Sequence, residues 1–420
     1  MTTYRILTLD GGGSWALIEV RALKALFGGD TPGHQILKHF DMAASNSGGS
    51  LVLGGLIANM TPNELDRLFH TKAQRKSIFP SIHGRAPLAW LFAHLFGIGP
   101  RYSSKRKLTG IQNVLNQKKT PGNPEQGYAG ISLSEAAAIL STENKKDIHL
   151  MMVGFDYDRN RAKFFRTADT GSTLGIGTVT KNVTLAEAIH ASTNAPVQYF
   201  NAPAHAGDGH RYWDGAISGC NNPVLAAVTE AIAMNPSISK EIVALSVGTG
   251  SVVLPGPYPA IKTKSPYVLQ QSGPGLISGI LKLAKAVMAE PVDSASFTAH
   301  VMTGLNNDNA IGGSHIVRMS PMLRPVIDPI SGKWTHPPCM NTEIFTAISK
   351  LDMDAIKDAQ VALIDILTQL WLDDKIPNQP VRMNGDTLEC EIGDTSFGKA
   401  REHWQAYDTP HVTGTRHAAE

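Results

Sequence analysis

The sequence predicts an α/β fold with a mainly parallel central sheet. A β-prone run at residues 4–9 leads into a glycine-rich loop, and apolar residues then recur at helical spacing. The same order of strand, sharp turn and helix returns at residues 40–59. Two such units within the first 60 residues are typical of parallel strands with helices on both faces of the sheet.

Later apolar runs and helix-capping signals predict the remaining elements. Four further strands are expected at residues 148–155, 162–166, 242–247 and 315–319. Capping boxes, in which a Ser or Thr precedes a Glu by three positions, mark two helix starts at residues 132–135 and 184–187. Amphipathic helices are expected at residues 276–289 and, with a break near 350–353, at residues 340–372.

Composition favours a large globular protein. The chain has 420 residues, of which 42% are hydrophobic and 18% charged, which argues against disorder. Its 38 basic and 36 acidic side chains give a net charge of +2, which does not indicate a nucleic-acid polymer as partner. We expect a core over residues 4–250 and a helical extension over residues 251–420, packed together as one continuous unit.

Cysteine usage and hydropathy favour a cytoplasmic protein. The three cysteines are far apart and form neither a zinc-binding spacing nor a disulfide framework. The N-terminus shows no secretory signal pattern. The longest apolar run, residues 88–99, is twelve residues long and too short to cross a bilayer. No cofactor is expected from any motif.

The first candidate functional motif is Ser45-Asn46-Ser47-Gly48-Gly49, where a predicted strand turns into a helix. Such an elbow projects the side chain of its central serine, here Ser47, away from the backbone. Small residues on either side, here Ser45 and Gly49, let the strand and the helix approach closely. A structural Gly/Ser-rich loop is the alternative interpretation of this motif alone.

The second motif is Asp10-Gly11-Gly12-Gly13, which precedes the first predicted helix. Consecutive glycines let backbone N–H groups converge on one point, and a helix N-terminus adds positive potential, so the loop suits an oxyanion or a phosphate. It lacks the Lys-Ser/Thr pair of a P-loop and the spacing of a dinucleotide-binding loop. A plain structural turn is the alternative.

The third motif is Tyr212-Trp213-Asp214-Gly215-Ala216. Asp214 is able to take the proton of a serine hydroxyl if the two groups lie within hydrogen-bonding distance. Asp-Gly is also a common turn dipeptide, so the segment by itself favours a turn.

Taken in this order, the three motifs resemble the patatin-like phospholipase family. Phe40-Asp41 and the segments at residues 191–196 and 246–250 strengthen the resemblance, which extends over roughly residues 4–250. The resemblance implies a three-layer α/β/α fold with a mainly parallel sheet and an added helical C-terminal part. It also implies lipid acyl hydrolysis of the phospholipase A type, through a Ser–Asp dyad without histidine.

Carried over to this chain, the resemblance makes Ser47 the nucleophile and Asp214 the base, held in a loop with Gly215 and Ala216. Backbone amides around three residues would form the oxyanion hole: Gly11, Gly12 and Gly13. The chain departs from the family pattern at Ser45, where the family has glycine. It also has Trp15 and Ala16 where the family has a basic residue followed by glycine.

Three other interpretations stay open at this stage. A Ser–His–Asp esterase would use one of the histidines that follow the elbow, which include His205, His210, His300 and His315. A metal site from His205, Asp208 and His210 has suitable ligand types, but its glycine-rich context favours a turn, so no metal is expected. A lipid- or partner-binding module without catalysis is the third interpretation.

A basic, aromatic segment at residues 67–124 predicts an insertion that contacts an anionic membrane surface or acts as a lid. It holds eleven Lys or Arg residues and no Asp or Glu, and an apolar stretch lies inside it. Basic residues beside an amphipathic aromatic stretch suit the surface of an anionic bilayer. The contact candidates are Trp90, Phe92, Phe96, Lys105, Arg106 and Lys107. The alternative is a core helix with solvated basic flanks.

The family resemblance also implies a regulatory hypothesis. Bacterial relatives include effectors that a cyclic nucleotide switches on, and the C-terminal third of this chain could carry such a switch. The sequence contains no nucleotide-binding motif that would support it directly. The expected partners are therefore a phospholipid membrane and, under this hypothesis, a nucleotide activator.

Overall fold

The computed structural model describes residues 3–82, 99–167, 183–256, 265–269, 291–304, 314–385 and 387–408. A central sheet of eight strands has the order β11-β9-β1-β2-β5-β8-β7, and β6 pairs with β5. Its strands are β1 (Tyr4–Leu9), β2 (Met42–Asn46), β5 (His149–Asp156), β6 (Arg161–Arg166), β7 (Ala204–His205), β8 (Arg211–Asp214), β9 (Ile242–Val247) and β11 (Ile316–Met319).

The sheet is mainly parallel. Strands β11, β9, β1, β2 and β5 run parallel to one another, whereas β6 and β8 each pair antiparallel with β5, and β7 pairs antiparallel with β8. The predicted α/β fold class is thereby confirmed. The described part of the chain also forms four short two-stranded sheets: β3 (Lys119–Thr120) with β4 (Asn123–Gly127), β10 (Ser251–Val252) with β12 (Met322–Leu323), β13 (Val326–Ile327) with β14 (Trp334–Thr335), and β15 (Arg382–Met383) with β16 (Cys390–Ile392).

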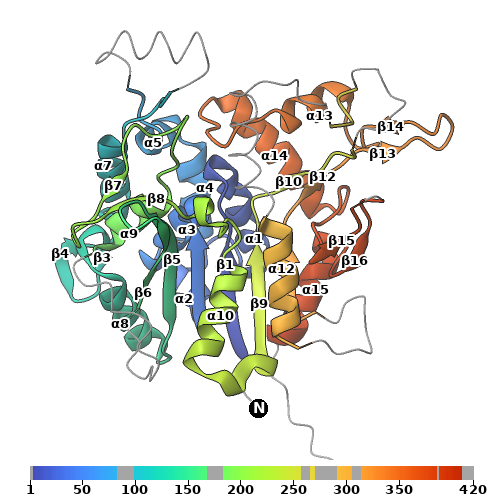
Figure 1. Ribbon diagram of the computed structural model, residues 1–420. Coiled ribbons are helices and arrows are strands. Elements are labelled where there is room, and N and C mark those ends of the chain that lie inside the picture. The colour runs from blue at the N-terminus through green and yellow to red at the C-terminus, as the bar shows by residue number, and fades with distance from the viewer. Residues whose placement is uncertain are drawn as a thin grey trace, which may run out of the picture.

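Helices surround the sheet on both faces (Figure 1). The α-helices are α1 (Leu17–Phe27), α2 (Gly33–Leu37), α3 (Ser47–Ile57), α4 (Pro62–His70), α5 (Lys72–Ile78), α7 (Ser104–Leu115), α8 (Leu133–Asn144), α9 (Leu185–Ser192), α10 (Val224–Met234), α12 (Pro291–Met302), α13 (Thr342–Ser349), α14 (Asp358–Leu372) and α15 (Phe397–Asp408). The 3-10 helices are η1 (Gly13–Ala16), η2 (Tyr128–Gly130), η3 (Gly215–Ser218) and η4 (Pro236–Glu241).

Side chains alternate between two apolar layers along each strand. In β1, Ile6 packs in a cluster with residues of α10 and α12, whereas Leu7 packs in the larger cluster that includes α1, α3 and α9. Figure 1 shows α10 and α12 against one face of the strands. Because both faces are covered, the parallel strands consist mostly of apolar residues, which is the pattern that made them predictable.

Most predicted elements have their expected bounds. Strands β1 and β9 match the predicted ranges, and α8 and α9 begin at the two capping boxes, each with both reciprocal hydrogen bonds present. Helix α3 begins at Ser47 rather than residue 51, because the elbow residues themselves form its first turn. The predicted helix at residues 276–289 and residues 83–98 of the basic segment lie outside the described residues.

The segment after residue 250 takes part in the central sheet. Strand β11 adds an edge next to β9, α15 packs against β11, and α14 packs against α1 (Figure 1). Helices α13 and α14 occupy the region predicted as interrupted and amphipathic, with the break at residues 350–357. None of the helices in the described ranges is long and apolar enough to cross a membrane.

Candidate active site

Two of the three motifs lie side by side because β1 and β2 are parallel neighbours. Leu9 pairs with Ser45 at the carboxyl ends of these strands, so the glycine loop after β1 and the elbow after β2 emerge at the same edge of the sheet. This edge is where parallel α/β sheets bind their ligands.

Ser47 lies in a strained turn between β2 and α3. Its φ angle of 47° places it in the left-handed region, which is uncommon for a residue with a side chain and is often found at functional sites. The turn is tight enough that a Cβ atom on Gly49 would lie 2.5 Å from the carbonyl oxygen of Leu9. Glycine is therefore required at position 49, as the elbow pattern predicts. The Ser47 side chain is only 5% exposed.

A chain of buried, hydrogen-bonded hydroxyl groups contacts the elbow. The Ser45 and Ser50 hydroxyls lie 2.9 Å apart, and Ser50 in turn lies 2.9 Å from the hydroxyl of Ser192 on α9. The backbone N–H of Ser47 donates to Ser192 Oγ at 3.1 Å. Ser45 thus replaces the usual glycine without leaving its hydroxyl unpaired, because Ser50 provides a partner.

The glycine loop presents two backbone amides beside the elbow. The N–H of Gly11 donates to the carbonyl of Asn221 at 2.8 Å, and Thr249 Oγ1 donates to the carbonyl of Gly11 at 2.7 Å. No hydrogen bond from the N–H of Gly12 or Gly13 to a loop or side-chain acceptor occurs within the described residues. Of the three residues predicted for an oxyanion hole, Gly12 and Gly13 therefore have amides to offer, whereas the Gly11 amide is already used.

Asp214 lies at the end of β8, where it pairs with Gly154 of β5. Its Oδ1 accepts hydrogen bonds from the N–H of Ala216 at 2.9 Å and from Asn46 Nδ2 at 3.3 Å. Its Oδ2 is buried and has no hydrogen-bond partner within the described part of the chain.

Burial raises the pKa of the Asp214 carboxyl, and four interactions oppose this effect. The largest comes from the side chain of Ser47, followed by the Ala216 N–H, the charge of Lys107 and the side chain of Asn46. Ser47 is thus close enough to stabilise the carboxylate, although their side chains do not reach the geometry of a regular hydrogen bond. Such a contact often tightens only when substrate is bound.

A buried ion pair anchors the glycine loop. Asp10, the residue before the three glycines, pairs with Arg318 of β11 at 2.5 Å, and both side chains are almost fully buried. Arg318 also donates to Ser246 Oγ at 2.9 Å. Burial raises the pKa of Asp10 against the effect of Arg318, and burial together with the Asp10 charge raises the pKa of Glu19 well above its usual value.

A segment between α13 and α14 covers the glycine loop. The N–H of Ser14 donates to the carbonyl of Met353 at 2.8 Å, and Trp15 Nε1 donates to the carbonyl of Asp352 at 3.2 Å. Trp15, which departs from the family pattern, therefore binds this covering segment. Arg101 and two tyrosines hold the same segment through its two carboxylates: Asp352 and Asp354 accept hydrogen bonds from Tyr199 and Tyr102, respectively, and both pair with Arg101.

An apolar cavity opens beside the glycine loop. Gly13 and Ser14 line one part of it, and its other walls come from α3, α4, α5, α7 and α9. The apolar side chains include Leu51, Met60, Leu65, Leu68, Phe69, Ile78, Phe79, Ile111, Val114, Leu115 and Ile189. Leu51 lies one helical turn after Ser47 on α3, so this cavity is next to the elbow.

The described histidines do not form a triad with Ser47. His190 is buried near the site, but its Nε2 pairs with Ser104 Oγ at 3.0 Å, and burial lowers its pKa to about 3. His300 and His315 bond to Ser314 and to the carbonyl of Thr303. None of the hydrogen bonds found among the described residues joins a histidine to Ser47 or Asp214.

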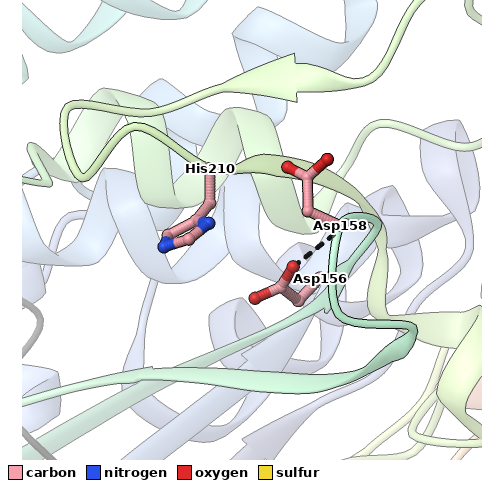
Figure 2. A group of neighbouring side chains, drawn as sticks. All are labelled: Asp156, Asp158 and His210. Atoms are coloured by element: carbon pink, nitrogen blue, oxygen red, sulfur yellow. Dashed lines mark hydrogen bonds between the residues drawn. The ribbon is translucent and has the colours of Figure 1, made fainter.

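A group of ligand-type side chains occurs near His210, but with different partners from those considered in the sequence. Asp156, Asp158 and His210 bring ligand atoms within 4.8 Å of one another (Figure 2). Asp158 already binds Arg211 through its carboxylate, and Asp156 accepts from the backbone of Asp158 and from Arg159. Two guanidinium groups at these carboxylates disfavour an added cation.

Asp208 and His205 are not part of that group. The Asp208 carboxylate instead accepts hydrogen bonds from the backbone N–H of His210 at 3.1 Å and from the Tyr212 hydroxyl at 2.6 Å. This arrangement is that of a turn preceding β8.

The basic segment divides between surface and interior. Lys105 and Arg106 are exposed on α7, but Lys107 is only 1% exposed. The expectation that Lys107 contacts a membrane is therefore wrong. It lies on the same helical face as the buried residues Ser104 and Ile111, three and four positions away, which turn toward the core. Trp90, Phe92 and Phe96 lie outside the described residues.

The sequence did not single out several residues that shape this site. Asn46, Ser50 and Ser192 contact the elbow or the base, and Met353 covers the glycine loop. Asn46 and Ser192 lie within segments that resemble the family, so the resemblance could have placed them near the site. No sequence pattern pointed to Ser50 or Met353, because their roles depend on contacts between distant parts of the chain.

This α/β arrangement, with a serine in a strand-to-helix elbow beside a glycine loop, is that of a hydrolase-type fold. Residues 7–228, more than half of the chain, match the model of the family described as patatin-like phospholipase. The chain belongs to the patatin-like phospholipase family, which confirms the resemblance drawn from the motifs and supports lipid acyl hydrolysis as its class of reaction. No curated protein matches it by sequence.

Solved bacterial proteins are similar in structure at low identity. VipD from Legionella pneumophila has 11% identity and a TM-score of 0.36, with 87% of this chain and 67% of VipD covered. The type III effector ExoU has 13% identity and a TM-score of 0.25, with 72% of this chain and 54% of ExoU covered. ExoU of Pseudomonas aeruginosa in complex with SpcU has 16% identity and a TM-score of 0.24, with 46% and 38% covered.

Proposed function

We propose that this protein is a serine carboxylic-ester hydrolase that cleaves fatty-acyl esters of membrane glycerophospholipids. In this proposal Ser47 is the nucleophile, Asp214 is the base and the amides of Gly12 and Gly13 stabilise the oxyanion. The observation that carries the proposal is the strained Ser47 close to the buried Asp214. The Oδ2 of Asp214 has no hydrogen-bond partner among the described residues, and burial raises the pKa of this carboxyl against the opposing effect of the Ser47 side chain.

The reaction follows from these positions. Asp214 accepts the hydroxyl proton of Ser47 while Ser47 Oγ forms a bond to the ester carbonyl carbon. The carbonyl oxygen gains negative charge, which the two amides and the N-terminus of α3 stabilise. Collapse of this intermediate breaks the ester bond, the leaving alcohol takes the proton from Asp214, and an acyl-enzyme remains. Asp214 then takes a proton from water as the water oxygen forms a bond to the acyl carbon. The bond from this carbon to Ser47 Oγ breaks, Asp214 returns the proton to Ser47 Oγ, and the fatty acid leaves.

The apolar cavity supports a fatty-acyl substrate. Its lining is almost entirely hydrocarbon and includes Gly13 of the glycine loop and Leu51, which lies one helical turn after Ser47. An acyl chain there would leave its carbonyl near Ser47, and burial of its methylene groups would contribute on the order of 0.8 kcal/mol each to binding. The polar headgroup would remain outside this cavity.

Two alternatives receive less support. A Ser–His–Asp esterase needs a histidine at the serine, whereas the group that interacts with Ser47 is the Asp214 carboxyl. A binding module without catalysis has no need for a strained serine, and such strain costs on the order of 1–3 kcal/mol.

Membrane contact and regulation are further parts of the proposal. The exposed Lys105 and Arg106 support docking on an anionic bilayer, which exchange of both for Glu should weaken in a vesicle-sedimentation assay. Activation by a cyclic nucleotide stays a prediction that rests on family resemblance. Vesicle hydrolysis that does not change when cyclic di- and trinucleotides are added would contradict it.

The testing experiment uses a mixed phospholipid extract and mass spectrometry. The wild-type protein is expected to release fatty acids and lysolipids, and Ser47→Ala and Asp214→Asn are each expected to abolish release. Gly130→Ala is a suitable control, because an added methyl group there meets no atom within 4 Å. Hydrolysis by Ser47→Ala at the wild-type rate would refute the proposal.

A further inference from the structure

A fully buried lysine lies near the proposed base. Lys107 projects from α7 into the core, where its Nζ donates to the carbonyl of Thr193 and lies 4.0 Å from the centre of the Phe200 ring. Lysine is almost never fully buried unless it is paired, because removing an ammonium group from water costs several kcal/mol. The position of Lys107 therefore calls for a partner of opposite charge.

That partner is Asp214. It is the one carboxylate whose charge acts on Lys107 among the described residues, although the two side chains do not form a direct ion pair within 4.0 Å. One short turn links them: the carbonyl of Thr193 accepts from Lys107, and the carbonyl of the next residue, Asn194, accepts the backbone N–H of Asp214 at 3.1 Å. Charge and backbone contacts thus connect Lys107 with the base.

The interaction matters because Asp214 must be ionised to accept a proton from serine. Burial raises the pKa of Asp214 and so opposes ionisation, whereas the ammonium group of Lys107 lowers it. In return the Asp214 carboxylate raises the pKa of Lys107 against the larger effect of burial, which leaves it at about 7. At acidic pH, where Asp214 takes up its proton, Lys107 is fully charged.

We propose that Lys107 is a positioning residue of the Ser–Asp dyad, which keeps the Asp214 carboxyl ionised and fixes the Thr193–Asn194 turn that orients it. This inference rests on the proposed function of Ser47 and Asp214. It assigns a role in the active site to a residue that the sequence placed on a basic surface.

Other titratable groups near α7 have other partners. His190 of α9 also interacts with Lys107, but its pKa of about 3 keeps it neutral over the range in which Asp214 is tested. The other charged groups on the elements packed against α7 contact different residues or are exposed. Arg75 and Lys72 of α5 pair with Asp358, Lys76 of α5 is exposed, Tyr128 of η2 faces Glu143, and Glu187 of α9 caps its own helix. The electrostatic effect on Asp214 is therefore attributable to Lys107.

The test is the pH profile of kcat/KM on a soluble fatty-acyl ester for the wild type, Lys107→Met and Lys107→Arg. Lys399→Met is the control, since it removes an exposed cation from α15, a helix to which no part of the proposed site or membrane contact is assigned. Removal of the Lys107 charge should shift the acidic limb of the kcat/KM profile upward by about one pH unit. At pH values below this limb, kcat/KM should therefore fall about tenfold. Lys107→Arg should keep the limb near its wild-type position, and so should Lys399→Met.

Two outcomes would overturn the inference in different ways. If hydrolysis depends on Ser47 but the profile of Lys107→Met coincides with that of Lys399→Met, Lys107 has no such role and the dyad stands. If Ser47→Ala hydrolyses the ester as fast as the wild type, the proposed function fails and the role of Lys107 fails with it.

A second measurement covers the case in which Lys107→Met does not fold. Asp214→Asn removes the charge that supports a protonated Lys107, so it should lower the Tm more at about pH 6 than at about pH 9, where Lys107 is neutral. The sign follows because the Asp214 carboxylate stabilises the ammonium form of Lys107, which is populated at about pH 6 and not at about pH 9. A Tm change that is the same at both pH values would contradict the pairing.

Discussion

The contact between the glycine loop and the elbow can be disturbed by a single methyl group at Gly48. A Cβ atom there would lie 2.7 Å from the carbonyl oxygen and 2.8 Å from the nitrogen of Gly13. These separations are about 0.7–0.8 Å shorter than a favourable contact, and both atoms belong to backbone that has no flexible side chain to move aside. Gly48→Ala must therefore push the loop away from Ser47.

The expected cost is mainly catalytic. A displacement approaching 1 Å of a reacting group costs about 10²-fold in rate, and loss of one oxyanion donor costs about 10²–10³-fold. Folding should suffer less, because alanine favours a helix by about 1 kcal/mol over glycine and this gain offsets part of the strain.

The assay pairs ester hydrolysis with thermal unfolding. We expect Gly48→Ala to lose about 10²-fold or more in kcat/KM while it remains folded at the assay temperature. Gly130→Ala, whose added methyl group meets open space, should retain wild-type activity. A folded Gly48→Ala protein that hydrolyses the ester at the wild-type rate would show that Gly13 is not positioned for catalysis.

Four further predictions test the surroundings of the site. Arg318→Met removes the ion-pair partner of the buried Asp10 carboxylate and should lower the free energy of unfolding, measured in urea, by about 3–5 kcal/mol. The double variant that adds Asp10→Asn should regain part of this loss, and an unchanged unfolding midpoint of Arg318→Met would contradict the prediction. The folded-state pKa of Glu19 is raised well above its ordinary value of 4.5, so the ionisation of Glu19 at higher pH destabilises the folded protein. Glu19→Gln should therefore raise the Tm more at about pH 8 than at about pH 5, and equal gains at both pH values would contradict this pH dependence. Asp354→Asn weakens the contacts that hold the covering segment and should speed labelling of the serine by a fluorophosphonate severalfold, whereas slower or unchanged labelling would show that the segment does not limit access. Leu51→Trp narrows the apolar cavity and should reduce hydrolysis of palmitoyl esters more than of butyryl esters; equal losses would place the acyl chain elsewhere.

Local patterns predicted the fold and the location of the site. Apolar strands of the parallel sheet, two capping boxes and the two strand–turn–helix units each depend on residues close in sequence. The elbow glycine at position 49 was also predictable, because close packing of a strand against a helix constrains the residues directly around the turn.

Contacts between distant segments were not predictable from these patterns. Lys107 looked like part of a basic surface because charge counting ignores which helical face a residue occupies, and the spacing from Lys107 to Ile111 was the available signal for burial. Trp15 looked like the loss of a cation, whereas its indole binds the carbonyl of Asp352, more than three hundred residues away. No short-range pattern contains that pairing.

The most direct test of the central claim is active-site labelling followed by mass spectrometry of the modified peptide. A fluorophosphonate applied to the folded wild-type protein in the presence of phospholipid vesicles should modify Ser47, and Asp214→Asn should slow the modification about 10²-fold or more, because the serine loses its base. Labelling at a different serine, or labelling of Ser47 at an equal rate in Asp214→Asn, would contradict the Ser47–Asp214 dyad.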